Sequence, residues 1–387
     1  MTHPVPWRAH APFYLCTLTW NVCLGMTHPL IPLYADSLGM SGMAIGTLIA
    51  LPVVLQLCFS LVGGAFTDRV GGRVLVLASS LFMCAGAIGY AMSSSFGSLL
   101  LAQLVMVLAR AMFWPATWTI AGNLPGLRSV ELGRLNAMTN SGQILGTLVG
   151  GASIAIAGFS GGFLLVAAAA LLAFAFMLRN PRAKATAVPG PFAPMVRYGR
   201  LMRMRPMLFI IMCAYISALP FSLSVSFYPL LFDAYGYSHE VNGFVLSLRG
   251  IGAALASMLV ARHLEFSMKG PVATGSALSV AIAVGAVGML SNLPSVCLFL
   301  FVVGVGSGLM ALNFQIMIAE VSAPEDRGSA NALGGLGWGM SHLATPILMG
   351  FLHDRVGIER AFVILAGLVI AWAVWLALLH RWAFGRR

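Results

Sequence analysis

Two arginines inside long apolar stretches are the residues of this sequence best placed to bind a ligand. Arg110 lies in the middle of residues 96–122, and Arg249 lies halfway along residues 239–261. A guanidinium stays protonated at any accessible pH, and an unpaired charge at the centre of a membrane costs at least ~2.5–3.5 kcal/mol. Water, an internal partner or a bound anion must offset that cost. The planar fork of arginine suits a carboxylate or a phosphate, so ligand contact and internal pairing both remain open.

The acidic residues favour a ligand that is anionic or zwitterionic. All 11 Asp and Glu lie in loops or at the ends of apolar stretches. Glu240 and Glu265, the acids nearest to Arg249 along the chain, would lie about 13 and 24 Å away along a helix axis. A cationic ligand would have no carboxylate at the midplane to receive it, whereas an anion could contact Arg249 and, as a second contact, Arg110.

Further polar and aromatic side chains within apolar stretches complete the candidate binding residues. Such side chains are costly against lipid and usually face a bundle interior or a water-filled cavity. Trp114 follows Arg110 by four residues and therefore shares its helical face, although core packing is the alternative for each tryptophan. Besides the two arginines, the candidate binding residues are Asn21, Trp114, Gln143, Asn313, Trp338 and His342.

His28 and Asp36 are the candidates for moving protons. Histidine titrates near physiological pH, and Asp36 ends the first apolar stretch. The alternatives are a hydrogen-bonded packing role for His28 and a loop-capping role for Asp36. The six cysteines are scattered singly, so neither a metal site nor a disulfide framework is expected.

The elements that carry these residues are predicted to be membrane-spanning helices. The chain is 59% hydrophobic and 9% charged, whereas soluble proteins carry about 25% charged residues. A span needs about 20 apolar residues, so we expect an all-α membrane protein with twelve spans. The predicted spans are 11–35, 42–66, 73–93, 96–122, 132–158, 161–178, 207–232, 239–261, 270–291, 294–319, 331–353 and 359–379.

Charge distribution predicts the topology of these spans. Of the 22 Lys and Arg, 18 fall on one side of the predicted spans, two (Arg355 and Arg360) on the other, and two within spans. Positive charge collects on the cytoplasmic side, so both termini are predicted to be cytoplasmic. The net charge of +11 is therefore explained by topology, and no nucleic-acid partner is expected.

The chain is predicted to consist of two related halves. Pro32 and Asp36 recur as Pro229 and Asp233, each 197 residues later, and the Pro/Gly/Arg-rich stretch 179–206 separates the two groups of spans. We therefore predict six-helix bundles at 1–178 and 207–387, joined by a cytoplasmic linker at 179–206. Parallel six-helix repeats are a known transporter architecture, with the substrate held between the halves.

The loop after the second span carries a motif with a known counterpart. Residues 63–73 read Gly-Gly-Ala-Phe-Thr-Asp-Arg-Val-Gly-Gly-Arg. This resembles the Gly-x-x-x-Asp-Arg-x-Gly-Arg-Arg signature of the major facilitator superfamily, with Gly72 in place of the first Arg of the final pair. The matching residues are Gly64, Asp68, Arg69, Gly71 and Arg73. In the family this cluster holds the cytoplasmic side closed, so the resemblance implies a conformational latch; the alternative is a role in topology alone.

A glycine run in the fifth span resembles the antiporter signature of the same family. Gly142, Gly146, Gly150 and Gly151 fit the pattern, but Thr147 stands where proline is usual. Small residues at every fourth position also allow close helix packing in membranes. An export-specific hinge and plain packing both remain open.

The resemblance implies the major facilitator fold and a function close to that of the bacterial twelve-helix drug and small-molecule proton antiporters. We expect a monomer in a bacterial inner membrane that exports a small organic solute by alternating access, with protons as the coupling ion. Proton-coupled or exchange-driven uptake of an organic anion is the alternative. The sequence contains no phosphate-binding loop, His-Glu-x-x-His or Gly-x-Ser-x-Gly motif, so we expect neither an enzyme nor a cofactor.

Overall fold

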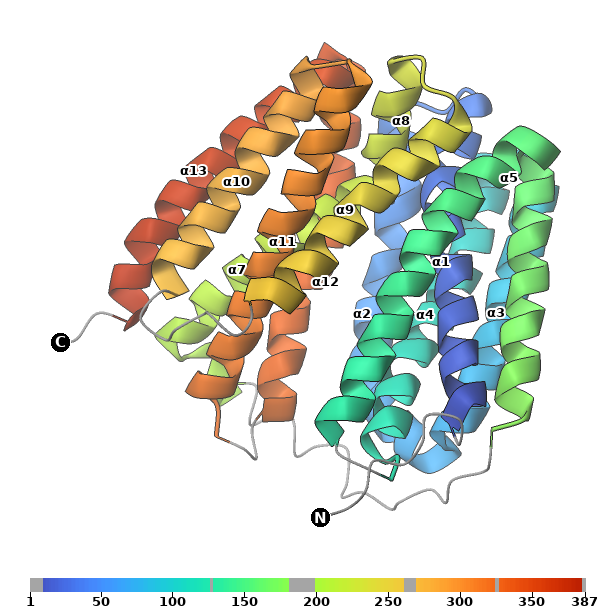
Figure 1. Cartoon of the computed structure of the whole chain (residues 1–387), viewed down its shortest axis with the longest axis horizontal. Coiled ribbons are helices and arrows are strands. Elements are labelled where there is room, and N and C mark those ends of the chain that lie inside the picture. The colour runs from blue at the N-terminus through green and yellow to red at the C-terminus, as the bar shows by residue number, and fades with distance from the viewer. Residues whose placement is uncertain (1–9, 126–127, 181–198, 261–268, 324–326, 385–387) are drawn as a thin grey trace. The chain divides into compact units, whose positions relative to one another are not determined.

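The computed structural model describes residues 10–125, 128–180, 199–260, 269–323 and 327–384, and within them the ordered elements are helices (Figure 1). Their lengths follow from the apolar runs of the sequence, which are long enough to cross a bilayer. The helices are α1 (Ala11–Ser37), α2 (Gly42–Val70), α3 (Gly72–Met92), α4 (Phe96–Gly122), α5 (Arg128–Leu178), α7 (Arg205–Ser224), α8 (Phe227–Ala234), α9 (His239–Val260), α10 (Lys269–Met289), α11 (Leu293–Val321), α12 (Arg327–Val356) and α13 (Ile358–Phe384).

The predicted fifth and sixth spans form the single element α5, which turns back on itself at Gly158 (Figure 1). Gly158 has φ 67° and ψ −178°, a conformation that glycine adopts without steric cost. The two limbs of α5 therefore correspond to the two predicted spans.

The predicted seventh span is interrupted between α7 and α8, close to Pro220. Proline lacks an N–H and weakens the helix around it. Ser222 donates to the carbonyl of Ala218 (3.2 Å) and Ser224 to that of Pro220 (2.9 Å). Ser226 donates through its hydroxyl to the carbonyl of Ser222 (2.5 Å), while its own N–H bonds to the carbonyl of Leu223. The Ser226 hydroxyl therefore serves a carbonyl that has lost its helical N–H at the break, as a membrane interior requires.

Among the described residues, nine helices are long and apolar enough to cross a membrane. The doubled element α5 counts once among them. The helices α1 and α12 are long enough but fall outside this group, since α1 contains Asn, Thr, His and Pro residues and α12 contains polar residues and several glycines. These are also helices that carry candidate binding residues.

The chain divides into two compact units, which we describe separately. Unit 1 comprises Met1–Met40, Leu51–Pro191 and Ser238–Phe244, and unit 2 comprises Ser41–Ala50, Phe192–Tyr237 and Val245–Arg387. The first residues of α2 therefore belong to unit 2, and those of α9 belong to unit 1. The predicted domain limits at 178 and 207 remain a prediction.

The glycines of α5 serve close helix packing within unit 1. The stripe Gly142, Gly146 and Gly150 faces α1, and a Cβ on Gly146 would lie 2.7 Å from the Cα of Gly25. Gly151 instead faces α9, where a Cβ would lie 3.0 Å from the Cα of Gly243. Since real Cβ atoms do not approach this closely, α5 packs on two neighbours through glycine.

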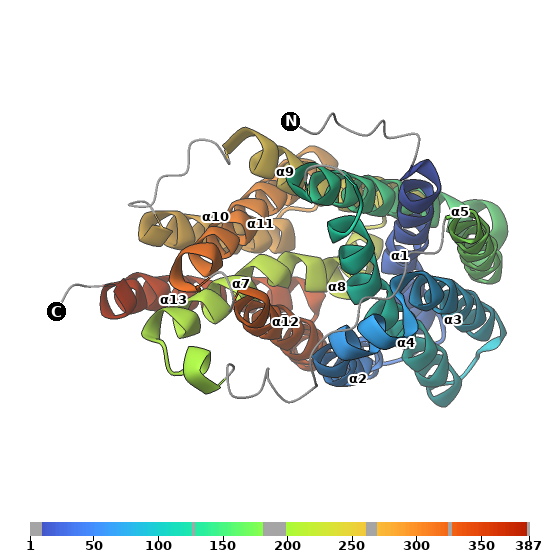
Figure 2. The same cartoon turned by 90° about the horizontal axis from the view of Figure 1, so that it is seen from below.

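A similar crossing joins α2 to α12 within unit 2. A Cβ on Gly46 would lie 2.9 Å from the carbonyl carbon of Pro346. At the start of α2, the carboxylate of Asp354 accepts hydrogen bonds from the backbone N–H groups of Gly42 (2.7 Å) and Met43 (2.9 Å). Elsewhere in this unit α10 packs beside α11 and α13, and α12 beside α7 (Figure 2).

Candidate functional site

In unit 2, three of the predicted binding residues gather around the ring of Phe221. The guanidinium carbon of Arg249 lies 5.2 Å from the centroid of that ring. The Trp338 and His342 rings lie 5.4 and 5.3 Å from it, and they stack on each other at 4.9 Å. These residues come from α7, α9 and α12, so the cluster unites segments far apart in the sequence. We call Phe221, Arg249, Trp338 and His342 the arginine–aromatic cluster.

Hydroxyl groups lie beside the arginine–aromatic cluster. Ser222 and Ser341 are each adjacent in sequence to a cluster residue, and their oxygens are 3.4 Å apart. Ser341 also lies 3.4 Å from the hydroxyl of Thr345. All three side chains are buried. The site therefore combines aromatic faces and one cation with groups that can donate or accept.

The imidazole of His342 is oriented by its own helix. Its Nδ1 lies 2.9 Å from the carbonyl oxygen of Trp338. A carbonyl oxygen can only accept, so Nδ1 carries the proton of this hydrogen bond. This fixes the tautomer of the neutral ring and holds it against the Trp338 indole.

The charge of Arg249 is not neutralised by a carboxylate within the described chain. The ion pairs seen there are Arg134 with Glu131 and Lys269 with Glu320. The Arg249 Nε is buried without a hydrogen-bond partner among the described residues. A desolvated cation–π contact is worth about 2 kcal/mol, which offsets only part of the burial cost.

In unit 1, Arg110 lies in the middle of α4. In the same unit, the phenol of Tyr90 on α3 donates to Gln103 Oε1 of α4 at 2.8 Å. Within the described residues, the Nε of Arg110 is likewise buried without a hydrogen-bond partner. Each of the two membrane arginines thus has a buried Nε that lacks a hydrogen-bond partner within the described chain.

Trp114 belongs to a stack of aromatic rings in unit 1. The Trp20 and Phe113 rings lie parallel, 3.7 Å apart, and Trp114 meets the edge of Trp20 at 6.1 Å. Trp20 and Phe113 are fully buried, whereas Trp114 is half-buried. Trp114 is therefore the ring of this stack that could meet a ligand.

The predicted residues Asn21 and Gln143 are partners of each other. Gln143 Nε2 donates to Asn21 Oδ1 at 3.2 Å, and Asn21 Nδ2 donates to the carbonyl of Thr17 at 2.9 Å. The pair joins α1 to α5 next to the glycine stripe. Asn21 is buried and Gln143 half-buried, so the amide of Gln143 is the more accessible of the two.

Asn313, His28 and Asp36 lie on α11 and α1, two helices that contribute no residue to the arginine–aromatic cluster. Asn313 is buried and donates to the carbonyl of Lys269 at 2.9 Å, a contact that ties α11 to the start of α10. His28 is buried in α1, and Asp36 is exposed near the end of the same helix.

The predicted latch is described in part. Gly71 precedes α3 with φ 89°, and Arg73 Nη2 donates to the carbonyl of Leu178 at 2.8 Å. Leu178 ends α5, so Arg73 satisfies a carbonyl that the helix leaves bare. Gly64, Asp68 and Arg69 lie in the part of α2 whose side chains are outside the described residues.

A buried carboxylate near the start of α5 was missed by the sequence analysis. Glu131 is 2% exposed, receives a hydrogen bond from the Tyr14 hydroxyl and pairs with Arg134 at 2.9 Å. The signal in the sequence was the spacing of Glu131 and Arg134, which places them one helical turn apart.

These features define a class of protein. Among the described residues, no group of three His, Cys, Asp or Glu could hold a metal ion, and the clusters contain side chains suited to binding. Membrane-crossing helices with cationic and aromatic groups inside each unit are characteristic of a transporter of small solutes.

The comparisons with known proteins identify the family. The model of the Major Facilitator Superfamily matches residues 13–264 and 212–384, so the chain belongs to this superfamily. It is thus a multi-pass membrane transporter and not an enzyme, and the predicted fold class is confirmed.

Relatives and solved structures agree with this assignment. The quinolone resistance protein NorA of Staphylococcus aureus (strain MSSA476) is 24% identical over 362 residues, which cover 91% of each chain. The multidrug resistance protein 1 of Bacillus subtilis (strain 168) is 23% identical over 130 residues, 33% of each chain. The fold resembles the nucleoside transporter NupG, with a TM-score of 0.82 at 13% identity over 98% of this chain and all of that one. A bacterial homolog of the human lysosomal transporter Spinster gives a TM-score of 0.80 at 13% identity, with 98% of each chain covered.

Proposed function

We propose that this chain is a secondary transporter that exports a small aromatic anion or zwitterion by alternating access, driven by protons. The observation that carries the proposal is the arginine–aromatic cluster, whose cation has no carboxylate partner among the described residues. The relation to NorA, a quinolone resistance protein, supports both the direction and the kind of solute.

The chemistry of the cluster suits a flat ring that bears a carboxylate. Trp338 and Phe221 offer aromatic faces that stack on a planar solute, and the fork of Arg249 can pair with a carboxylate through two hydrogen bonds. Quinolone carboxylic acids combine these features, so we propose compounds of this kind as substrates.

Binding of a quinolone carboxylic acid and of its methyl ester tests the proposal directly. The ester keeps the ring system and loses the carboxylate charge. A hydrogen bond to a charged group is worth about 1.5–3 kcal/mol, so Arg249→Ala should weaken binding of the acid by about 10- to 150-fold. Binding of the ester should change little. Arg249→Lys keeps the charge but loses the planar fork. Its affinity for the acid should lie between that of the parent and that of Arg249→Ala.

The matched control is Arg360→Ala, which removes an exposed arginine from α13. It should leave the affinities for acid and ester unchanged. Equal losses for acid and ester in Arg249→Ala would mean that the carboxylate does not meet Arg249. Unchanged binding together with a large drop in thermal stability would make Arg249 a structural residue.

Coupling to protons is proposed on the basis of the family relation, with His28 and Asp36 as the candidate residues. Transport of the labelled acid into inverted proteoliposomes should increase when a pH gradient is imposed. His28→Gln or Asp36→Asn should abolish that increase if the residue carries the proton. Flux that ignores the gradient would favour exchange or uptake of an organic anion.

We further propose a monomer in a bacterial inner membrane, with both termini in the cytoplasm and a latch at Asp68. The charge distribution supports the topology, and reporter fusions at Arg387 and within residues 183–188 should both report cytoplasm. Asp68→Asn should reduce transport in vesicles while leaving ligand binding intact. Normal transport by this variant would restrict Asp68 to a role in topology.

A further inference from the structure

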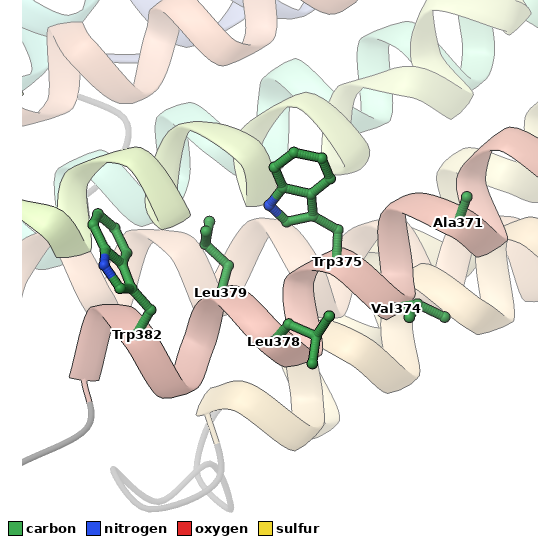
Figure 3. Close-up of a pocket in the computed structure, with 6 residues that line it drawn as sticks. All are labelled: Ala371, Val374, Trp375, Leu378, Leu379 and Trp382. Atoms are coloured by element: carbon green, nitrogen blue, oxygen red, sulfur yellow. The ribbon is translucent and has the colours of Figure 1, made fainter.

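The outer face of α13 carries a shallow apolar groove. It is lined by Ala371, Val374, Trp375, Leu378, Leu379 and Trp382. Figure 3 shows the two indole rings projecting from the same side of the helix, as expected for residues seven positions apart. Trp375 is 60% exposed and Leu378 is 65% exposed, so large apolar surfaces of the groove lie open within the described chain.

The end of the groove is strongly basic. The guanidinium carbon of Arg205, the first residue of α7, lies 5.0 Å from the centroid of the Trp382 ring, and Arg381 is exposed next to that tryptophan. Arg200 and Arg203 lie shortly before Arg205 in sequence. The described stretches 199–210 and 371–384, which meet at this end, contain four arginines and no acid.

We propose that this groove binds an anionic phospholipid. The acyl chain lies along Trp375 and Leu378, and the phosphate pairs with Arg205 and Arg381. From Ala371 to Trp382 the helix rises about 16 Å at 1.5 Å per residue, close to the thickness of one leaflet, roughly half of a ~30 Å hydrocarbon core. This placement puts Trp382 at the membrane interface, where tryptophan commonly anchors a protein.

The charge of the arginines makes the groove prefer an anionic headgroup to a zwitterionic one. A guanidinium matches the phosphate geometry with two hydrogen bonds, and basic pockets between membrane helices on the cytoplasmic side bind anionic lipids. The stacking of Arg205 on Trp382 holds the guanidinium above the groove without neutralising it. A zwitterionic lipid would fit the apolar part equally well but would gain less from the arginines.

Native mass spectrometry of the full chain in mild detergent can measure this selectivity. The protein is mixed with equal amounts of phosphatidylglycerol and phosphatidylcholine that have identical acyl chains, and the ratio of bound lipids is recorded. One arginine near an anionic headgroup contributes a factor of about five. Arg205→Gln and Arg381→Gln should therefore each lower the ratio about fivefold. Arg205→Lys should retain part of the preference.

Two further variants separate the headgroup from the groove. Arg360→Gln removes the same charge at the opposite end of α13 and should leave the ratio unchanged. Trp375→Ala should reduce the amount of both bound lipids and leave their ratio intact. Thermal unfolding in detergent checks that all variants are folded.

Equal binding of the two lipids by the wild-type chain would overturn the proposal. So would an Arg360→Gln variant that loses as much selectivity as Arg381→Gln, because the preference would then reflect total charge. Dimers without bound lipid would instead assign the groove to a second copy of the chain.

Discussion

The first turn of α2 is held in unit 2 by the carboxylate of Asp354, and removing that carboxylate should loosen the crossing of α2 and α12. Both carboxylate oxygens are engaged, at 2.7 Å from the N–H of Gly42 and 2.9 Å from that of Met43. The N–H groups at a helix start have no partner within the helix. A carboxylate placed there also interacts favourably with the helix dipole.

The size of the effect follows from the number and exposure of these bonds. Each contributes about 0.5–1.5 kcal/mol, and loss of a helix-capping side chain costs about 0.5–2 kcal/mol. Asp354 is exposed, which reduces its electrostatic contribution. We therefore expect Asp354→Ala to destabilise the closed arrangement of α2 and α12 by roughly 1–2 kcal/mol relative to the open one. This corresponds to about a 5- to 30-fold rise in the population of the open arrangement.

Alkylation of a buried cysteine can measure that population. Ala50 lies one helical turn after Gly46, on the face of α2 that meets α12, and is 0% exposed. A cysteine there should therefore react with a maleimide only when the crossing opens. In a chain without its six native cysteines, Ala50→Cys should react about 5- to 30-fold faster when combined with Asp354→Ala. Asp354→Asn keeps one acceptor and should give a smaller increase.

The matched control is Asp233→Ala, which removes an exposed carboxylate from α8 of the same unit. It should leave the alkylation rate unchanged. If Asp354→Ala reacts no faster than the parent, the two hydrogen bonds contribute nothing to closure. If both variants accelerate equally, net charge rather than capping controls the reaction.

Three further predictions concern packing and buried polar groups. Gly243→Val should lower stability by about 1–3 kcal/mol in thermal unfolding, because the new side chain meets Gly151; full stability would show that α5 and α9 can separate freely. Glu131→Ala should cost about 1–3 kcal/mol, and adding Tyr14→Phe should cost little more, since both changes remove the same hydrogen bond; fully additive losses would contradict that contact. Arg73→Gln should cost about 0.5–1.5 kcal/mol in the same assay and, if its role is to cap α5, should leave the transport rate near that of the parent.

Much of the fold could be predicted from the sequence, because each span is a long apolar run. The predicted break between residues 158 and 161 coincides with the turn at Gly158, since glycine allows the positive φ that reverses the chain there. The interruption between α7 and α8 was not predicted. Pro220 and the serine row were visible, but an apolar run does not indicate where its backbone hydrogen bonds are broken.

The candidate site was predicted as single residues and not as a constellation. Arg249, Trp338 and His342 were singled out because polar or amphipathic groups are unusual within apolar helices. Phe221, which brings them together, is an ordinary apolar residue in such a helix and gives no signal of its own. The sequence also could not show that Asn21 and Gln143 pair with each other, because spacing along one helix does not determine which neighbouring helix it meets.

The internal repeat extends from the sequence to the helix crossings. Gly46 of α2 and Gly243 of α9 occupy matching positions in the two halves. Each packs so closely on the backbone of a neighbouring helix that a Cβ at that position would clash with it. Their partners, Pro346 and Gly151, are 195 residues apart. The dipeptide Asn136-Ala137 recurs as Asn331-Ala332 at this same offset. Glycine is therefore required on α2 and α9 by the approach of a backbone, whereas α12 accommodates proline at the contact.

The crossing of α5 and α9 and the crossing of α2 and α12 are stabilised by different interactions. The crossing in unit 1 has glycine on both helices and an aromatic contact between Phe159 and His239 at 5.9 Å. The crossing in unit 2 adds the two hydrogen bonds of Asp354. Packing contacts weaken gradually as helices slide, whereas hydrogen bonds are lost within a fraction of an ångström. The crossing of α2 and α12 should therefore open as a discrete step, and Asp354 is the residue through which its frequency can be changed.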